Sequence, residues 1–87
     1  MKETEFAILH DIDNIGQFLV NTTFDHDEEK FILTLKYWSE SINGYVELSL
    51  KWDGDDNGER LYEENFAKFK NIDYCKEWVE KIESTDL

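Results

Sequence analysis

The segment from Phe31 to Trp52 constrains the fold more than any other part of this chain. Polar and apolar side chains alternate on both sides of Asn43-Gly44, a pair that two-residue type I′ hairpin turns prefer because both positions need positive φ. Such a turn places Ile42 opposite Tyr45 and pairs the strands outward as far as Leu35 and Trp52. One face of this antiparallel hairpin is then apolar, and it carries Phe31, Leu33, Leu35, Tyr37, Val46, Leu48, Leu50 and Trp52.

The opposite face of the hairpin carries Trp38 and Tyr45 near Glu40 and Glu47. In the predicted register Glu40 lies directly opposite Glu47, which is locally unfavourable. Trp and Tyr are also common hot-spot residues of protein interfaces. Two interpretations stay open: this face is an interaction surface, or a helix formed by residues 11–16 covers it.

Two more strands are predicted upstream, at Glu5 to Leu9 and at Gly16 to Phe24. A short turn or helix is expected between them at residues 11–16. The competing interpretation is a longer helix through residues 11–20 with Asp11 as its cap. It is based on apolar residues at three- and four-residue spacing, namely Ile12, Ile15, Phe18 and Leu19.

The C-terminal part predicts a loop at residues 53–59 followed by two helices. Tyr62, Phe66 and Phe69 recur at helical spacing in the first helix. Asn71 is a plausible N-cap of the second, with Asp73 in its first turn. The apolar stripe of that helix is Ile72, Cys75, Trp78, Val79 and Ile82. The expected fold is a single α+β domain over residues 1–87, an antiparallel sheet of three to four strands with one or two C-terminal helices packed on one face.

The predicted loop contains Asp53-x-Asp55-x-Asn57-Gly58-x5-Glu64, a spacing that resembles the calcium loop of EF-hand proteins. The resemblance implies Asp53, Asp55, Asn57 and Glu64 as calcium ligands. The context departs from that family, because a strand precedes the loop and Arg60 stands where an aliphatic residue is usual. A solvated acidic loop is the preferred interpretation and a calcium-binding module is the alternative. No cofactor is expected, and Ca²⁺ is the only one that the motif leaves open.

No set of residues in the sequence predicts catalysis. His10 and His26 are flanked by carboxylates and are expected in exposed loops without an orienting partner. Cys75 is the single cysteine and lies on an apolar helix stripe, where a thiol behaves as a small buried hydrophobe. We therefore expect that the protein is not an enzyme. A lone cysteine also fits the reducing cytoplasm.

The acidic composition indicates what kind of partner the protein has. Asp and Glu number 21 against 9 Lys and Arg, for a formal charge of −12. An aromatic content of 15% excludes a disordered acidic tail. The charge argues against direct contact with nucleic acid or an anionic membrane, and no apolar run is long enough to cross a bilayer. A folded body that carries this self-repulsion predicts a positively charged partner.

The candidate partner-binding residues fall into three groups. One group surrounds the predicted loop, and its members are Asp53, Asp55, Asp56, Glu59, Glu63 and Glu64. The second is the acidic turn with Asp25, Asp27, Glu28 and Glu29. The third is on the hairpin, where Trp38 and Tyr45 supply apolar anchors beside Glu40 and Glu47.

In size, acidity and mixed α/β pattern the chain resembles the small phage-encoded DNA-mimic inhibitors of the anti-CRISPR and anti-restriction class. This resemblance implies a stoichiometric inhibitor that acts in the cytoplasm of a host cell and blocks the nucleic-acid-binding site of a nuclease. The alternatives are an immunity protein that neutralises a cognate toxin nuclease and the calcium-binding module described above. The oligomeric state stays open.

Overall fold

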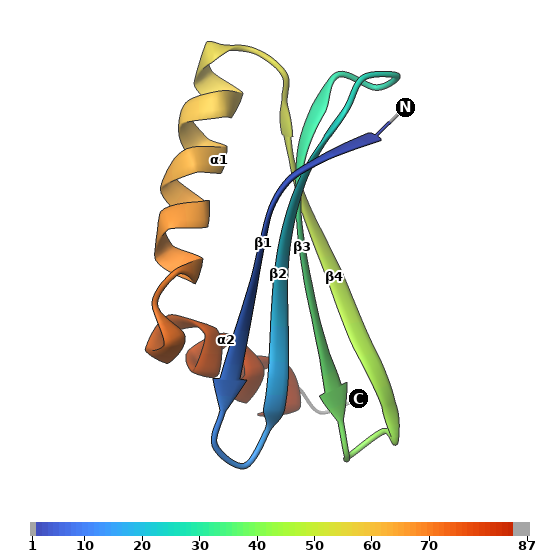
Figure 1. Ribbon diagram of the computed structural model, residues 1–87, viewed down its shortest axis with the longest axis vertical. Coiled ribbons are helices and arrows are strands. Elements are labelled where there is room, and N and C mark those ends of the chain that lie inside the picture. The colour runs from blue at the N-terminus through green and yellow to red at the C-terminus, as the bar shows by residue number, and fades with distance from the viewer. Residues whose placement is uncertain (1, 85–87) are drawn as a thin grey trace.

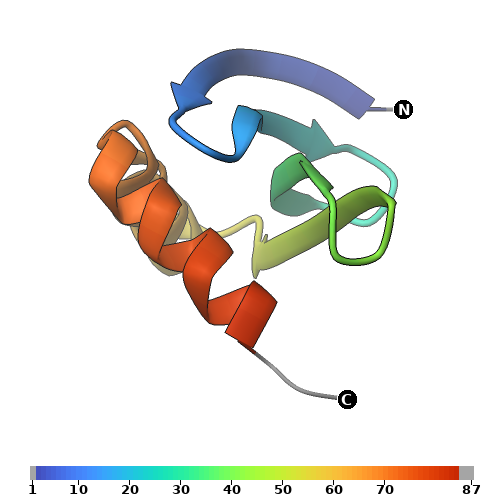
Figure 2. The ribbon, with the colours of Figure 1, turned by 90° about the horizontal axis from the view of Figure 1, so that it is seen from below.

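Four strands and two helices make up the fold. The computed structural model describes the backbone of residues 2–84 and the side chains of residues 7–84. In chain order the elements are β1 (Lys2–Ile12), β2 (Gly16–Asp25), β3 (Lys30–Ser39), β4 (Gly44–Asp53), α1 (Asp56–Phe69) and α2 (Ile72–Ser84). The strands form one antiparallel sheet in the order β1-β2-β3-β4, and both helices lie on the same side of it (Figures 1 and 2). The predicted α+β class is confirmed.

The N-terminal hairpin settles the structure of residues 11–20. β1 continues to Ile12, which pairs with Gly16 across a short turn. Asn14 and Gly16 have φ values of 68° and 103°, which fit Asn and Gly better than other residues. The helix considered for residues 11–20 is therefore wrong, because a strand there lets Phe18 and Val20 bury completely against the helices. Part of the predicted strand Glu5 to Leu9 has side chains outside the described residues.

The β3–β4 hairpin is present, but its predicted register is wrong by four residues. Ser39 pairs with Gly44, Trp38 pairs with Tyr45, and residues 40–43 form the turn. Asn43 has a φ of 52° and donates its N–H to the Glu40 carbonyl over 3.2 Å. A two-residue turn at Asn43-Gly44 would leave residues 30–33 without partners in β4, whereas the observed register pairs both strands over their whole length. A shift of four is even, so the predicted apolar face is preserved.

The core lies between the sheet and the two helices. Its fully buried side chains include Phe18, Val20 and Leu33 from the sheet with Phe69 and Cys75 from the helices. The predicted helical stripes pack against this core, with the exception of Ile72, which is 43% exposed. Among the described helices none is long and apolar enough to cross a membrane.

Both helices begin with a side-chain cap. Asn71 Oδ1 accepts hydrogen bonds from the backbone N–H groups of Asp73 and Tyr74, at 2.8 and 3.3 Å, as predicted. At α1, Asp55 accepts from the N–H of Gly58 over 2.7 Å, so the helix already begins at Asp56. The predicted loop at residues 53–59 is therefore wrong after residue 55. Acidic residues in the first turn of a helix are stabilised by its dipole, and composition alone did not separate them from a loop.

Candidate functional site

The structure brings two separate acidic segments together at one end of the sheet. The β2–β3 turn and the β4–α1 connection lie side by side, because Gly54 donates its N–H to the Glu29 carbonyl over 2.8 Å (Figure 1). We call the exposed carboxylates of these segments the acidic end, and they are Asp27, Glu28, Glu29, Asp53, Asp55, Asp56 and Glu59. Two groups that were separate predictions from the sequence therefore share one surface.

Two glycines allow the close backbone approach at the acidic end. A Cβ at Gly54 would lie 2.7 Å from the Glu29 carbonyl oxygen and 3.2 Å from the Phe24 ring. A Cβ at Gly58 would lie 1.8 Å from the carbonyl oxygen of Asp53. Real Cβ atoms do not approach backbone oxygens this closely. The start of α1 is thus held tightly against the end of β4, and the carboxylates around it are displayed from a fixed backbone.

Asp25 differs from the other predicted partner-binding acids because it is only 7% exposed. Its Oδ1 accepts hydrogen bonds from the backbone N–H groups of Asp27 and Glu28, at 3.0 and 3.2 Å. An aspartate that binds backbone groups two and three residues onward stabilises a turn. Asp25 therefore shapes the turn that displays its acidic neighbours.

Basic side chains offset part of the charge of the acidic end. Lys30 forms an ion pair with Asp53, and the hydrogen bond and charge of Asp53 raise the pKa of Lys30. Lys51 Nζ lies 3.9 Å from Glu28 Oε2. Exposed pairs of this kind contribute little to stability, because water and salt screen them. Carboxylates still outnumber the three nearby bases Lys30, Lys51 and Arg60 among the described side chains.

Glu63 and Glu64 continue the acidic surface along α1, away from the acidic end. Both side chains are exposed. Glu64 accepts a hydrogen bond from Arg60 Nη1 over 3.1 Å, one helical turn earlier. This pair is of the i,i+4 type, which contributes a few tenths of a kcal/mol to a helix.

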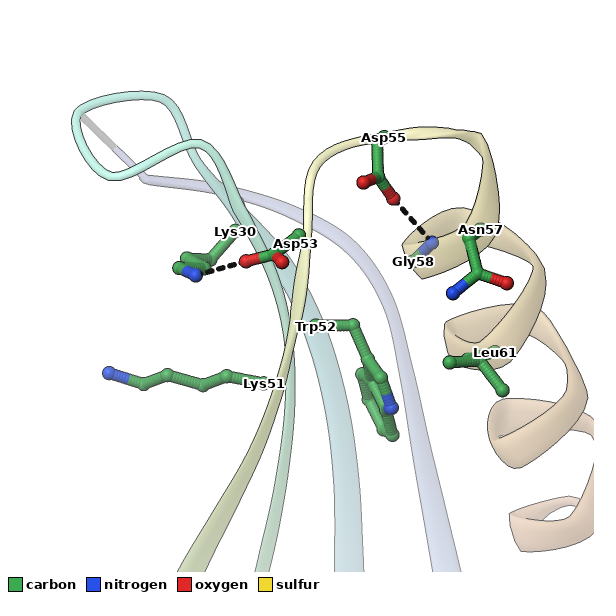
Figure 3. Close-up of a pocket in the computed structure, with 8 residues that line it drawn as sticks. All are labelled: Lys30, Lys51, Trp52, Asp53, Asp55, Asn57, Gly58 and Leu61. Atoms are coloured by element: carbon green, nitrogen blue, oxygen red, sulfur yellow. Dashed lines mark hydrogen bonds and ion pairs between the residues drawn. The ribbon is translucent and has the colours of Figure 1, made fainter.

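The side chains predicted as calcium ligands point to different neighbours. Asp53 lies against Lys30 on one side of β4, while Asp55 and Asn57 belong to the start of α1 (Figure 3). Asn57 and Glu64 both accept hydrogen bonds from Arg60. The hollow beside these residues, about 240 Å³, is also lined by Lys30 and Lys51. Within residues 7–84 no group of three or more His, Cys, Asp or Glu side chains is arranged to hold a metal. Calcium binding stays a prediction, which calorimetry with Ca²⁺ tests.

The predicted aromatic anchors lie at the other end of the uncovered sheet face. Trp38 and Tyr45 are 41% and 64% exposed, and their rings meet edge to face with centroids 5.1 Å apart. No described helix covers them, so the interpretation of a covering helix at residues 11–16 is wrong. From Tyr45 to Asp53 along β4 the distance is about 26 Å at 3.3 Å per residue. The structure thus divides the predicted partner-binding residues between two surfaces.

The two glutamates near this aromatic pair do not face each other. Glu47 lies opposite Lys36 in the observed register, and Glu40 is in the turn. The Lys36 ammonium also lies 4.8 Å from the centre of the Tyr45 ring. The predicted Glu40–Glu47 repulsion is therefore wrong, and an opposite-charge pair replaces it.

The two histidines and the cysteine each contact other residues of the fold. His10 lies on β1 and not in a loop, and its Nε2 donates to the Phe69 carbonyl over 2.8 Å, since a carbonyl can only accept. His26 is exposed in the β2–β3 turn, with its ring 4.9 Å from that of Phe24. Cys75 is fully buried, and burial raises the pKa of its thiol to about 11. A thiol in this state is a poor nucleophile at neutral pH.

Sequence reasoning missed a hydrogen-bonded cluster around Glu83, which ties the end of α2 to β3. The carboxylate of Glu83 accepts from the hydroxyls of Tyr37, Ser39 and Ser41, with the two serines at 3.0 and 2.8 Å. The hydrogen bond from Tyr37, followed by those from Ser41 and Ser39, lowers the pKa of Glu83. Burial, together with Glu83, raises the pKa of Tyr37. The residues are more than 40 positions apart, so no local pattern predicts the cluster.

We expect this cluster to make stability depend on pH. Because the folded-state pKa of Glu83 is lowered, its stabilising effect is present above the unfolded value of about 4.3 and is lost as pH falls through the folded value. Glu83→Gln should therefore lower the urea midpoint at about pH 7 and have a smaller effect at about pH 3. Glu80→Gln, on the same helix, is the control. The expectation would be contradicted if the difference in urea midpoint between Glu83→Gln and the wild type were the same at both pH values.

No protein-family model, curated protein or solved structure matches this chain.

Proposed function

We propose that the protein is a stoichiometric inhibitor that presents its acidic end to the nucleic-acid-binding groove of a nuclease. It acts in the cytoplasm and blocks access of DNA to that groove, as an anti-CRISPR or anti-restriction protein would. The observation that carries this proposal is the meeting of two sequence-remote acidic segments on one fixed backbone, joined through Gly54 and Glu29.

Electrostatics explains why such a surface suits a DNA-binding groove. B-DNA carries one charge per about 1.7 Å of its axis, and grooves that bind it are lined with Lys and Arg. A dense group of carboxylates on a rigid support offers a similar field, which raises the association rate with a basic groove. The excess of carboxylates at the acidic end, beyond its three bases, fits this role.

Rigidity supports the proposal independently of charge. The turn of residues 25–29 is held by the Asp25 side chain, and α1 is capped by Asp55. Groups that are already ordered before binding lose little conformational entropy when the partner arrives. The acidic end can therefore use its charge for binding without first ordering two loops.

The proposal is tested by DNA cleavage with a panel of purified nucleases from CRISPR and restriction systems. We expect at least one nuclease to be inhibited at a one-to-one ratio, with weaker inhibition at high salt because exposed charges are screened within about 8–10 Å. Asp56→Lys with Glu59→Lys should weaken that inhibition roughly tenfold or more. Asp53 and Asp55 are left unchanged, because the first pairs with Lys30 and the second caps α1.

A matched double variant separates local charge from net charge. Glu77→Lys with Glu80→Lys alters two exposed glutamates of α2 and changes the formal charge by the same amount. We expect it to inhibit nearly as well as the wild type. Equal loss in both double variants, or no inhibition of any nuclease in the panel, would contradict the proposal. Circular dichroism of each variant confirms that the fold is retained.

A further inference from the structure

The outer edge of β4 is a regular, uncovered strand edge. β4 stands last in the sheet order, so among the described residues no strand pairs with its outer side (Figure 1). Its register with β3 runs without interruption from Gly44 to Asp53. β1, at the other edge, contains a register shift between Thr4 and Phe6. Bulges and prolines protect strand edges from pairing, and β4 has neither.

The core-facing side chains of β4 are incompletely covered. Val46, Leu48, Leu50 and Trp52 are only partly buried, whereas three of the β3 residues paired with them are at most 2% exposed, namely Leu33, Leu35 and Tyr37. A further strand beside β4 would cover this apolar row and satisfy the outward backbone groups of the edge.

The charges of β4 select the partner that fits this edge. In an antiparallel two-fold pairing of β4 with a second β4, centred on Ser49, Glu47 of each copy lies opposite Lys51 of the other. The same register places Leu48 opposite Leu50 and Val46 opposite Trp52. Pairings centred on residues 47 or 51 would place like charges opposite each other, and one centred on residue 50 would place Glu47 opposite Asp53. A pairing centred on residue 48 would match neither charge.

We infer that the protein forms a homodimer through antiparallel β4–β4 pairing centred on Ser49, which joins two sheets into one of eight strands. This register pairs opposite charges twice and apolar side chains four times, and both kinds of pair stabilise neighbouring strands. It also places Tyr45 of one copy opposite Asp53 of the other. The aromatic anchors of one copy then lie next to the acidic end of the second, which reunites the two surfaces that are separate in one chain.

The formal charge of −12 per copy opposes this association, since two such bodies repel. Added salt screens that repulsion, and the Debye length falls to about 3 Å at 1 M. We therefore expect the dimer to be favoured by salt. The nuclease inhibition proposed above is weakened by salt, so the two interactions respond in opposite directions.

Sedimentation equilibrium of the full chain tests the dimer. We expect the dimer fraction at a fixed protein concentration to rise between about 0.05 M and about 0.5 M NaCl. Glu47→Lys should raise the dimer Kd roughly tenfold or more, because each new lysine lies opposite Lys51 of the other copy. Lys51→Glu should do the same. The double swap Glu47→Lys with Lys51→Glu restores opposite charges in both places and should restore the dimer.

Of the two single variants, Glu47→Lys also separates this pairing from a general charge effect. Glu47→Lys makes the chain less negative, so net repulsion alone would strengthen the dimer, whereas the β4 pairing predicts that it weakens. Glu80→Lys on α2 has the same change of charge and should strengthen association slightly. A wild type that stays monomeric at high salt, or a double swap no better than the single variants, would overturn the inference.

Discussion

Gly58→Ala should destabilise the protein by about 3 kcal/mol or more, although alanine normally favours a helix over glycine by about 1 kcal/mol. Gly58 lies in the first turn of α1, where an added Cβ would be 1.8 Å from the Asp53 carbonyl oxygen. The obstacle is backbone, so a side-chain rotation cannot relieve the clash. Either α1 moves away from β4 or the end of β4 distorts. Urea unfolding followed by tryptophan fluorescence measures the loss.

Gly44→Ala is the matched control for this prediction. Its nearest neighbour would be the Ile42 carbonyl oxygen at 3.9 Å, an ordinary contact, and its φ is not in the left-handed region. We expect a change in the free energy of unfolding below about 1 kcal/mol for this variant. A Gly58→Ala protein as stable as Gly44→Ala would mean that the close approach of α1 to β4 is incorrect.

Phe69→Ala should have the largest effect, about 3–5 kcal/mol. Phe69 is fully buried at the end of α1, and its ring lies 5.0 Å from that of Tyr74 and 5.7 Å from that of Trp78. An 87-residue domain has a total stability of roughly 4–13 kcal/mol. The loss can therefore leave a large unfolded fraction at 37 °C, which the near-ultraviolet circular dichroism signal of the tryptophans would report.

The backbone of Phe69 also holds β1 and the two helices together, and it does so independently of the ring. Its carbonyl accepts from both His10 Nε2 and Cys75 Sγ, at 2.8 and 3.3 Å, and so joins β1 to both helices. These bonds do not need the Phe69 ring, so Phe69→Leu should lose only part of the stability, about 1–2 kcal/mol. A Phe69→Ala variant no less stable than Phe69→Leu would show that the ring is not part of a packed core.

Predictions from the sequence succeeded where the periodic spacing of apolar side chains along a single strand or helix was enough to identify its buried face. The alternation from Phe31 to Trp52 identified the core face of β3 and β4, and helical spacing identified Tyr62, Phe66 and Phe69 as buried. They failed where two local signals competed. The Asn43-Gly44 turn preference is local, and pairing the two strands over their full length outweighs it. By composition, the acidic run at residues 53–59 fits a loop and the start of a helix equally well. In the structure the Asp55 side chain caps the backbone, so the helix begins within this run.

The amino-acid sequence by itself determined the class of fold, the apolar faces and the acidic excess, because each follows from local periodicity or simple composition. Only the tertiary structure decided that the turn of residues 25–29 and the start of α1 form one acidic end, and that Glu83 accepts from Tyr37, Ser39 and Ser41. It also moved Glu47 from opposite Glu40 to opposite Lys36. The physical reason is that strand register and helix docking are fixed by contacts between residues far apart in the chain. The spacing of residues within one segment does not reveal those contacts.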